Sequence, residues 1–370
     1  MPGLFVKQQA ESVSQWCDVT VLYLHPDHQI KQKYEVVAAD EQGVHVIRVY
    51  YRVPSSGSLF SSLQKIRSFL IAIRKGMKSM NKKPVDLVHV HVLTRQGLIA
   101  LFLKLKKRIP YVITEHWSRY FKENDTYKGL FRKWITRIVV RNAAAVVAVS
   151  ERLKSEMLRH GLTNARFRVI PNAVDTKRFI ILKEKAFAPD SLKRIIHISC
   201  FEDKSKNISG FLRAIQQVSA ARQDFTVALI GEGPDWIQCK TYASALGLPG
   251  TIVSFTGLRS HDDLVKDLNN SDFLVLSSHY ETFGTVIIEA MACGIPVVST
   301  DAGIASSVIH DENGLLIPVN DESSLKTAIE EMLDRCRSFD RLKIRDGVVS
   351  AFDINRIAEQ LFTLYREALR

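Results

Sequence analysis

Short runs of apolar residues alternate with helical patterns along nearly the whole chain of 370 residues. Many of the apolar runs are continuous, as in DLVHVHV and FLVLS, which is typical of strands that helices cover on both faces. Strands that alternate with helices predict parallel sheets with crossover helices. The predicted strands are Val19–Leu24, Val44–Tyr51, Leu87–Val92, Tyr111–Thr114 and Ala145–Val149 in the first half, and Arg194–Ser199, Thr226–Ile230, Ile252–Thr256, Phe273–Leu276 and Pro296–Ser299 in the second.

The predicted fold class is therefore α/β, with two doubly wound, Rossmann-like domains that face a cleft. The chain length also favours two domains, since one domain commonly takes roughly 150 residues. A boundary is expected near residues 172–192, where IPNAVDTKRF closes a strand and a polar stretch with Pro189 and Asp190 follows. We predict domains over 1–176 and 177–352, with a final helix over 353–370 that could cross back to the first domain.

Charge divides the chain unevenly, although the whole carries a formal net charge of +12. Residues 1–176 hold 29 Lys and Arg against 13 Asp and Glu, a net of +16, which leaves −4 for residues 177–370. This asymmetry predicts an anionic partner for the first half: a membrane surface, a phosphorylated acceptor or nucleic acid. A merely solvated basic face is the alternative. Nucleic acid ranks last, because the basic runs lack interleaved aromatic residues.

Cysteine usage and hydropathy narrow the class of protein further. The five cysteines are scattered without a C-x-x-C pair, which argues against a disulfide framework or a zinc site. The longest apolar stretches are well short of the ~18 residues that cross a bilayer, and the first residues do not resemble a secretory signal. A cytoplasmic protein is expected, with a peripheral place on the inner membrane face as a further possibility.

A strand, a loop and a helix carry the strongest candidate chemistry, in SSHYETFGTVIIEAMACG from Ser277 to Gly294. Gly294 marks the end of the helix, and Thr282 is the expected N-terminal cap. Backbone N–H groups at a helix N-terminus form a ready site for a diphosphate. The donors would be the amides of Phe283, Gly284 and Thr285, with Gly284 allowing close approach.

Two carboxylates bracket this expected phosphate site. Glu281 precedes the helix, and Glu289 lies inside it, about 7 Å along the axis from Gly284 at ~1.5 Å per residue. Carboxylates accept hydrogen bonds from paired sugar hydroxyls, so Glu289 suits a ribose diol and Glu281 a second sugar. Spacing alone would also fit two solvent-exposed glutamates, but Glu289 stands among apolar residues and needs a partner there.

The motif ETFGTVIIEAMACGIPVV resembles the donor site of the retaining, GT-B-fold glycosyltransferases of family 4, also called glycosyl transferases group 1. The resemblance extends to IPNAVDTKRF, LIGEGP, FTGL and DENGLLIPVND, and covers nearly the whole chain, more loosely in its first half. It implies an N-terminal acceptor-binding domain and a C-terminal domain that binds a nucleotide sugar. Glu289 would then hold the ribose, Glu281 would contact the transferred sugar, and the amides from Phe283 to Thr285 would bind the distal phosphate.

The same resemblance places a phosphate-binding lysine at Lys206, in HISCFEDKSKN. This sequence departs from the family pattern just before it, because Ser199-Cys200 stands where the family usually has Gly-Arg. Lys204 could substitute for the missing arginine, although Glu202 and Asp203 lie in the same loop. Smaller departures are Ser306 in place of a common Glu and Ala173 in place of the usual Gly.

On the acceptor side, His116 follows a predicted strand within TEHWSRYF. A lone histidine is more often structural, but the family commonly has a histidine near the transferred sugar in this loop. Glu115 and Arg119 are expected beside it. Gly3 would belong to the glycine-containing loop that opens the family's fold, whose first strand is not found here, so the first sheet is expected to lack a strand.

Basic and apolar residues mix in RSFLIAIRKGMKSMNKK, residues 67–83, and in LIALFLKLKKR, residues 98–108. Such helices can lie against an anionic bilayer, or their apolar stripes can be domain core and their charges solvated. Either reading is compatible with a glycan or polyprenyl-linked acceptor.

The expected activity is transfer of a hexose-type sugar from a nucleotide diphosphate donor, by an enzyme of class EC 2.4 acting in cell-surface polysaccharide synthesis. The catalytic residues would be His116, Glu281 and Lys206. The sequence has no D-x-D motif and no metal-ligand spacing, so neither a metal nor a cofactor is expected besides the donor co-substrate. The alternatives are a non-catalytic nucleotide-sugar-binding protein and a nucleotide-sugar epimerase.

Overall fold

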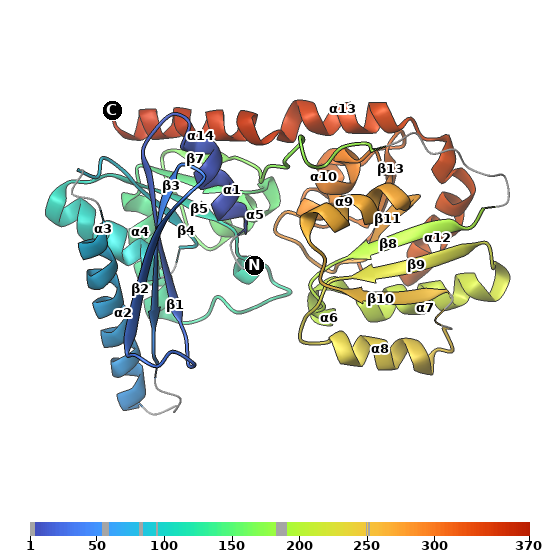
Figure 1. Ribbon diagram of the computed structural model, residues 1–370, viewed down its shortest axis with the longest axis horizontal. Helices are drawn as coiled ribbons and strands as arrows, with labels where there is room; N and C mark the ends of the chain where they lie inside the picture. The colour runs from blue at the N-terminus through green and yellow to red at the C-terminus, as the bar shows by residue number, and fades with distance from the viewer. Residues whose placement is uncertain are drawn as a thin grey trace. The chain divides into compact units, whose positions relative to one another are not determined.

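The computed structural model describes residues 4–53, 59–80, 84–93, 95–182, 191–248, 250 and 252–370. It has an α/β architecture in which mostly parallel sheets are flanked by helices, as predicted (Figure 1). The candidate residue Gly3, and Pro189 and Asp190 of the expected linker, lie outside the described residues.

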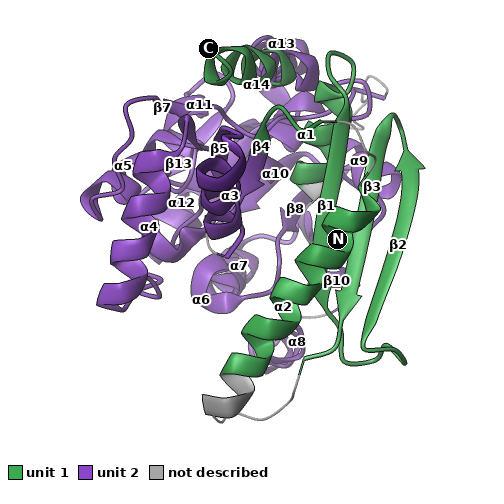
Figure 2. Cartoon of the chain, turned by 90° about the vertical axis from the view of Figure 1, so that its left-hand side faces the viewer, with its two compact units in different colours: residues 1–88, 358–370 green, residues 89–357 purple. Residues whose placement is uncertain are grey.

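The chain clusters into two compact units (Figure 2). The smaller unit comprises residues 1–88 and 358–370, and the larger comprises residues 89–357. The last helix, α14 (Ile354–Ala368), therefore contributes its later residues to the smaller unit. There the Phe362 ring stacks on Trp16 with centroids 5.7 Å apart. The domain boundaries predicted at residues 176 and 352 stay predictions.

The smaller unit holds a three-stranded sheet with the order β1-β3-β2. Strands β1 (Val19–Pro26) and β3 (Val44–Tyr51) are parallel, whereas β2 (Tyr34–Glu41) runs antiparallel to β3. Gln42 and Gly43 join β2 to β3 with φ angles of 46° and 83°, the left-handed conformation that a two-residue hairpin turn needs. Strand β2 was not predicted, because its residues are mostly exposed and Gln-Gly is a weak hairpin signal.

Two helices complete the smaller unit. Helix α1 (Leu4–Val13) precedes the sheet, and α2 (Leu59–Ser79) follows it. A Cβ atom on Gly76 would meet Leu22 Cδ1 at 2.4 Å, so the glycine lets α2 approach the sheet closely. Phe69, Ala72 and Ile73 are buried on this face of α2. The inner apolar stripe of residues 67–83 is therefore core, as far as the structure describes it.

In the larger unit, the first sheet has the order β4-β5-β6-β7. Its strands are β4 (Val88–His91), β5 (Tyr111–Glu115), β6 (Ala145–Ala148) and β7 (Phe167–Val169), the last of which was not predicted. The helices that accompany these strands are α3 (Arg95–Lys107), η1 (Ser118–Tyr120), α4 (Leu130–Asn142) and α5 (Glu151–Arg159). Strands β5, β6 and β7 are parallel, and every residue of β5 and β6 is buried. Among the described residues, the strands of the first half thus form two sheets instead of the single sheet expected.

The second sheet of the larger unit is parallel throughout, with the order β10-β9-β8-β11-β12-β13. Its strands are β8 (Lys193–Ile198), β9 (Phe225–Ile230), β10 (Val253–Gly257), β11 (Phe273–Leu276), β12 (Val297–Thr300) and the unpredicted β13 (Gly314–Ile317). Its helices are α6 (Asp203–Lys206), α7 (Ile208–Ala221), α8 (Trp236–Ala245), α9 (His261–Asn270), α10 (Thr285–Ala292), α11 (Ala305–Val308), α12 (Glu322–Arg335), η2 (Cys336–Ser338) and α13 (Arg341–Phe352).

The strand order reverses at β8, because the chain runs outward from β8 through β9 to β10 and then returns to β11 on the other side of β8. One core beneath this sheet joins Phe211 and Ile215 of α7 to Ile329 and Met332 of α12, all nearly inaccessible to solvent. Ligands of open α/β sheets bind at such a reversal, outside the carboxyl ends of the strands. A ligand-binding site is therefore expected at the loops that follow β8 and β11.

None of the helices in the described part of the chain is long and apolar enough to span a membrane.

Gly231, directly after β9, offers a test of how tightly the loops at this edge are packed. Its φ is +127°, and a Cβ atom there would lie 1.9 Å from the Ser199 carbonyl oxygen. We expect Gly231→Ala to lower the free energy of unfolding by at least about 2 kcal/mol, because the backbone of two loops must move. Urea unfolding of the variant measures the loss.

Gly347 in α13 is the matched control, since a Cβ atom there meets nothing within 4 Å. Gly347→Ala should raise stability slightly, by up to about 1 kcal/mol, because alanine favours the helix. Equal effects of the two substitutions would contradict the packing described here.

Candidate active site

The loops after β8 and β11 are held together by backbone and hydroxyl hydrogen bonds. The Ser277 hydroxyl donates to the carbonyl oxygens of Lys206 at 3.0 Å and Asn207 at 3.1 Å. The His279 amide donates to the Ser205 carbonyl at 2.9 Å. Asn207 has a left-handed backbone (φ 51°), and its side chain caps α7 by accepting from the Gly210 amide. This turn brings Lys206 back toward the strand ends.

At this place Lys206 and Glu281 form an ion pair between their Nζ and Oε1 atoms. The Ser278 hydroxyl donates to the same carboxylate oxygen at 3.0 Å. Both charged side chains are largely buried, with 15% and 16% of their surface exposed. The structure thus brings together two of the three predicted catalytic residues and adds Ser278, which stands only three positions before Glu281.

The protonation state of Lys206 follows from two opposing effects. Burial by itself would lower its pKa, but the nearby Glu281 carboxylate, helped by that of Glu202, outweighs burial and leaves the pKa raised. Lys206 is therefore a cation at neutral pH. A buried cation beside a helix N-terminus suits an anionic group such as a phosphate.

Helix α10 begins at Thr285, after Gly284, which has a left-handed backbone (φ 93°) and provides no side-chain cap. The prediction that Thr282 caps this helix is wrong. The Thr282 carbonyl instead accepts a hydrogen bond from the Ser150 hydroxyl at 2.6 Å. The first-turn amides of α10 are thus left without a capping side chain, as the predicted phosphate role of Phe283, Gly284 and Thr285 requires.

Glu289 projects from the second turn of α10 and is only partly accessible to solvent. Its carboxylate makes no hydrogen bond or ion pair within the described part of the chain, and burial raises its pKa to about 7. A partly buried carboxylate without a protein partner is energetically costly. It would be stabilised by hydroxyl donors from a ligand, which is consistent with the predicted role in holding a ribose.

The loop between β8 and α6 contains the departure from the family pattern. Cys200 and Lys204 are exposed, and Lys204 pairs with no acidic residue among those described. Glu202 is exposed as well, and one of its carboxylate oxygens accepts from the Ser205 hydroxyl at 2.6 Å. Lys204 therefore takes no part in the ion pair of Lys206 and Glu281, and its part in donor binding stays a prediction.

In the first sheet of the larger unit, Glu115 ends β5 and is fully buried. Its carboxylate accepts from the amides of Leu93, His116 and Trp117 at 2.8 to 3.1 Å, and from the Tyr120 hydroxyl at 2.9 Å. Burial raises its pKa, although these hydrogen bonds act in the opposite direction. Since four donors occupy the carboxylate, Glu115 fixes the loop that carries His116 instead of offering a free ligand.

His116 lies buried at the end of β5, with its Nε2 atom 3.2 Å from His91 Nδ1. The His91 ring is 4.1 Å from that of His89, whose Nε2 is 2.7 Å from the Thr114 hydroxyl. Burial and mutual proximity lower the pKa of His116 well below its ordinary value, and burial lowers that of His91 to about 4. All three rings are therefore neutral at pH 7.

These histidines do not form a group that could hold a metal ion, nor does any set of His, Cys, Asp and Glu residues in the described ranges. Arg119, the other predicted neighbour of His116, lies in η1 with its guanidinium 3.6 Å from the centre of the Trp117 ring.

Two further contacts join the first sheet's loops to those of the second sheet within the larger unit. Besides Ser150 to Thr282, Arg152 donates to the Asp301 carbonyl at 2.9 Å. Phe121 stacks on Tyr280 with centroids 6.4 Å apart. Sequence reasoning missed these residues, because only the fold brings positions so far apart into contact. Ser150 did carry one signal, since it follows a strand and caps α5.

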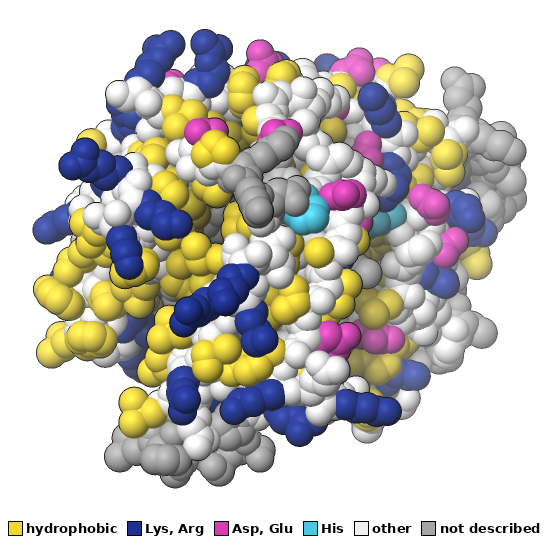
Figure 3. Space-filling model, turned by 60° about the vertical axis from the view of Figure 1, so that its left-hand side comes forward, with side chains coloured by type: hydrophobic (Ala, Val, Ile, Leu, Met, Phe, Trp, Pro, Cys, Tyr) yellow, Lys and Arg dark blue, Asp and Glu magenta, His cyan; other side chains and the backbone are white. Residues whose placement is uncertain are grey.

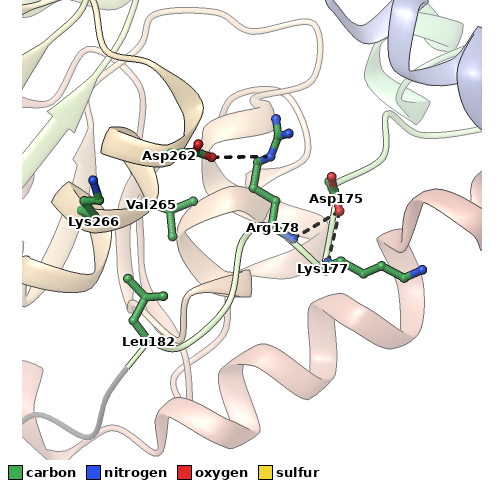
Figure 4. A pocket seen from close by; sticks show the side chains of 7 residues that line it. All are labelled: Asp175, Lys177, Arg178, Leu182, Asp262, Val265 and Lys266. Atoms are coloured by element: carbon green, nitrogen blue, oxygen red, sulfur yellow. Dashed lines mark hydrogen bonds and ion pairs between the residues drawn. The ribbon is translucent and has the colours of Figure 1, made fainter. Parts of the chain in front are cut away.

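A separate pocket lies beside the chain segment that follows β7. It is lined by Asp175, Lys177, Arg178, Leu182, Asp262, Val265 and Lys266 (Figure 4). Arg178 pairs loosely with Asp262 at 3.9 Å, and Asp175 accepts from two backbone amides. None of the predicted site residues lines this pocket, so it is separate from the predicted donor site.

The raised pKa of Glu289 predicts how stability depends on pH. Between its ordinary value of 4.5 and about 7, the folded protein keeps a proton that the unfolded chain has lost. Stability should therefore fall as pH rises through this window. Glu289→Gln should remove the penalty, and its gain over the wild type should grow from near zero at pH 4 to at most about 3 kcal/mol at pH 8. Urea unfolding at both pH values measures this gain.

Glu359→Gln, on an exposed position of α14, serves as the control and should show no comparable growth. A gain for Glu289→Gln that is the same at pH 4 and pH 8 would contradict the burial of this carboxylate.

Comparisons with known proteins show what the whole chain is similar to. The chain is 29% identical over 276 residues to an uncharacterised glycosyltransferase of Methanocaldococcus jannaschii, covering 74% of this chain and 73% of the relative. It is 27% identical over 346 residues to a Bacillus subtilis glycosyltransferase named for teichuronic acid biosynthesis, covering 88% and 84%. Among solved structures, sucrose-phosphate synthase from Thermosynechococcus elongatus is similar, with a TM-score of 0.80 at 22% identity, over 99% of this chain and 93% of that one.

Two family profiles match adjoining parts of the chain. "Glycosyltransferase Family 4" matches residues 5–178, and "Glycosyl transferases group 1" matches residues 192–335. The second match contains the Lys206 and Glu281 pair, helix α10 and Glu289. The two matches together span most of the sequence, and the fold is the GT-B arrangement of two parallel-sheet, Rossmann-like domains. This chain therefore belongs to the family 4 glycosyltransferases, the glycosyl transferases group 1, enzymes that transfer a sugar from a nucleotide donor.

Proposed function

We propose that the protein is a retaining, metal-independent hexosyltransferase that uses a nucleotide diphosphate sugar. The observation that supports this most directly is the buried Lys206 and Glu281 pair beside the uncapped N-terminus of α10. A diphosphate placed here would meet a lysine cation and free backbone amides. Both stabilise the negative charge that develops on the leaving group, which is usually the largest catalytic contribution.

In the proposed reaction, the bond between the sugar's anomeric carbon and the diphosphate oxygen breaks on one face of the sugar. The acceptor hydroxyl oxygen forms its bond on the same face, and the departing diphosphate oxygen takes the hydroxyl proton. Lys206 and Ser278 donate to one carboxylate oxygen of Glu281 and hold the side chain in place. In the proposed reaction this carboxylate accepts hydrogen bonds from sugar hydroxyls. No covalent glycosyl-enzyme is formed in this mechanism.

We propose the remaining donor contacts for the residues that the sequence singled out. Glu289 would bind the ribose hydroxyls, and the amides of Phe283, Gly284 and Thr285 would bind the distal phosphate. His116 would contact the transferred sugar as a neutral imidazole, because its pKa lies well below the ordinary value. Glu115 would position His116, and Arg119 and Lys204 are further candidate contacts.

For the acceptor, we propose a glycan or polyprenyl-linked acceptor in cell-surface polysaccharide synthesis. The basic balance of residues 1–176 supports an acceptor or a surface that carries negative charge. A place on the inner face of a membrane is part of this proposal.

The stereochemical outcome tests the mechanism. Product formed from an α-linked donor should keep the α configuration, as read from the anomeric proton coupling by NMR. Mass spectrometry of the protein after incubation with donor should show no added sugar. Inverted product, or an adduct on Glu281, would overturn front-face transfer.

Substitutions separate the roles of the carboxylates and the lysine. Lys206→Ala should lower kcat roughly 100-fold or more, because the leaving group loses its cation. Glu281→Ala should mainly lower kcat as well, whereas Glu289→Ala should mainly raise KM for the donor, by about tenfold. Steady-state kinetics with a panel of nucleotide sugars measures these effects, with Glu359→Ala as the control.

The two alternative functions give different results in the same assays. A non-catalytic binding protein would show donor binding without transfer or hydrolysis. An epimerase would convert the donor with no acceptor present. Wild-type kinetics in both the Glu281→Ala and Glu289→Ala variants would refute the assignment of this site.

A further inference from the structure

Helix α3 of the larger unit carries an apolar stripe on its outer side. Leu98, Phe102 and Leu105 recur at helical spacing, and all three are exposed, Leu105 to 72%. The opposite side of the helix is buried at Gly97 and Ala100. The inner side of α3 therefore supplies the core contact, and the outer stripe is left partly to largely exposed in the described fold.

Helix α4 exposes a second apolar cluster in its first two turns. Leu130 is 88% exposed, Phe131 73%, and Trp134 more than half. The rings of Phe131 and Trp134 lie 6.0 Å apart and contact each other. Large aromatic side chains are costly to leave in water, so a cluster of this kind points to a surface that is covered in function.

The two helices are neighbours in the larger unit. A Cβ atom on Gly97 of α3 would lie 2.8 Å from Val139 Cγ1 of α4, so the glycine permits close contact. Lys104 Nζ of α3 donates to the Asn142 carbonyl at the end of α4, at 2.6 Å. We call the exposed apolar residues of this helix pair, Leu98, Phe102, Leu105, Leu130, Phe131 and Trp134, the α3–α4 surface.

Every charged residue of these two helices is basic, and neither contains an acidic one: Arg95, Lys104, Lys106, Lys107, Arg132, Lys133, Arg137 and Arg141. Lys106 lies over the Phe102 ring, 5.6 Å from its centre. Hydrophobic and basic side chains occur side by side on the face of the molecule in Figure 3. The basic residues of the helices that carry the α3–α4 surface are therefore complementary in charge to an anionic partner.

We propose that the α3–α4 surface docks on an anionic lipid bilayer. Trp, Phe and Leu side chains enter the boundary between headgroups and acyl chains, while Lys and Arg bind lipid headgroups. An acidic protein would also be complementary to the basic residues. It accounts less well than a bilayer for the three exposed apolar residues at the start of α4, Leu130, Phe131 and Trp134. The inference deepens the proposed function and rests on its lipid-linked acceptor. Helix α3 follows β4, which ends at His91, and α4 follows β5, directly after which His116 lies. The proposed bilayer contact and the proposed acceptor side thus belong to the same sheet and its helices.

Vesicle binding tests this surface directly, without donor or acceptor, so its outcome is independent of whether sugar transfer occurs. The full chain should co-sediment with vesicles of phosphatidylglycerol and phosphatidylcholine, and bind at least about tenfold less to phosphatidylcholine alone. Phe131→Ser combined with Trp134→Ser should weaken binding to the anionic vesicles by about tenfold or more. Lys106→Glu combined with Lys107→Glu should have a similar effect that added salt reproduces in the wild type.

Ile237→Ser with Leu342→Ser is the matched control, since both residues are exposed apolar residues elsewhere in the larger unit. This variant should bind anionic vesicles like the wild type. Trp134→Phe should also bind, but should lose the blue shift of tryptophan fluorescence that insertion causes. Circular dichroism and thermal unfolding establish that each variant is folded.

Binding that is equal for anionic and neutral vesicles would overturn the proposal. Unchanged binding of the folded Phe131→Ser, Trp134→Ser variant would overturn it too, as would binding to an acidic protein with none to vesicles. If vesicle binding behaves as expected while no sugar is transferred, the surface stands and the proposed function fails.

Discussion

The reversal of strand order at β8 is the constraint on which the rest of the site depends. Because β9 lies on one side of β8 and β11 on the other, the loops that leave β8 and β11 diverge over the two sides of the sheet. The space between their starting points is where a ligand can approach backbone and side chains together. Lys206 reaches it from one loop, Glu281 and the start of α10 from the other, and the hydroxyl of Ser277 ties the loops together.

Two buried or partly buried carboxylates show how the same residue type serves opposite purposes. The Glu115 carboxylate accepts hydrogen bonds from three amides and a tyrosine hydroxyl, so its role is structural. Glu289 has no such donors among the residues that the structure describes, and burial alone raises its pKa to about 7. The fold tolerates the second arrangement at some cost in stability, which is a common feature of residues that bind a ligand.

The basic character of the first half has a structural meaning beyond its total charge. On α3 and α4 the lysines and arginines are joined to exposed Leu, Phe and Trp side chains, whereas the inner sides of the helices are ordinary core. Helix α2 of the smaller unit repeats the combination, with Leu63, Ile66 and Leu70 exposed beside Lys65 and Arg67. The core interpretation of these segments thus holds for the inner side of each helix, and docking on a bilayer stays a proposal for the outer side.

The sequence by itself determined the α/β class, ten of the strands and the candidate donor segment, because each leaves a local trace: continuous apolar runs, a glycine before a helix, a glutamate among apolar residues. Strands β2, β7 and β13 left weaker traces, since they are short or half exposed and are defined by their partners. Only the tertiary structure decided that Ser278 donates to the Glu281 carboxylate, that Lys206 is the lysine paired with Glu281, and that four donors occupy the Glu115 carboxylate. Those facts depend on contacts between chain segments far apart in sequence or on how a loop turns, and local pattern carries no record of either.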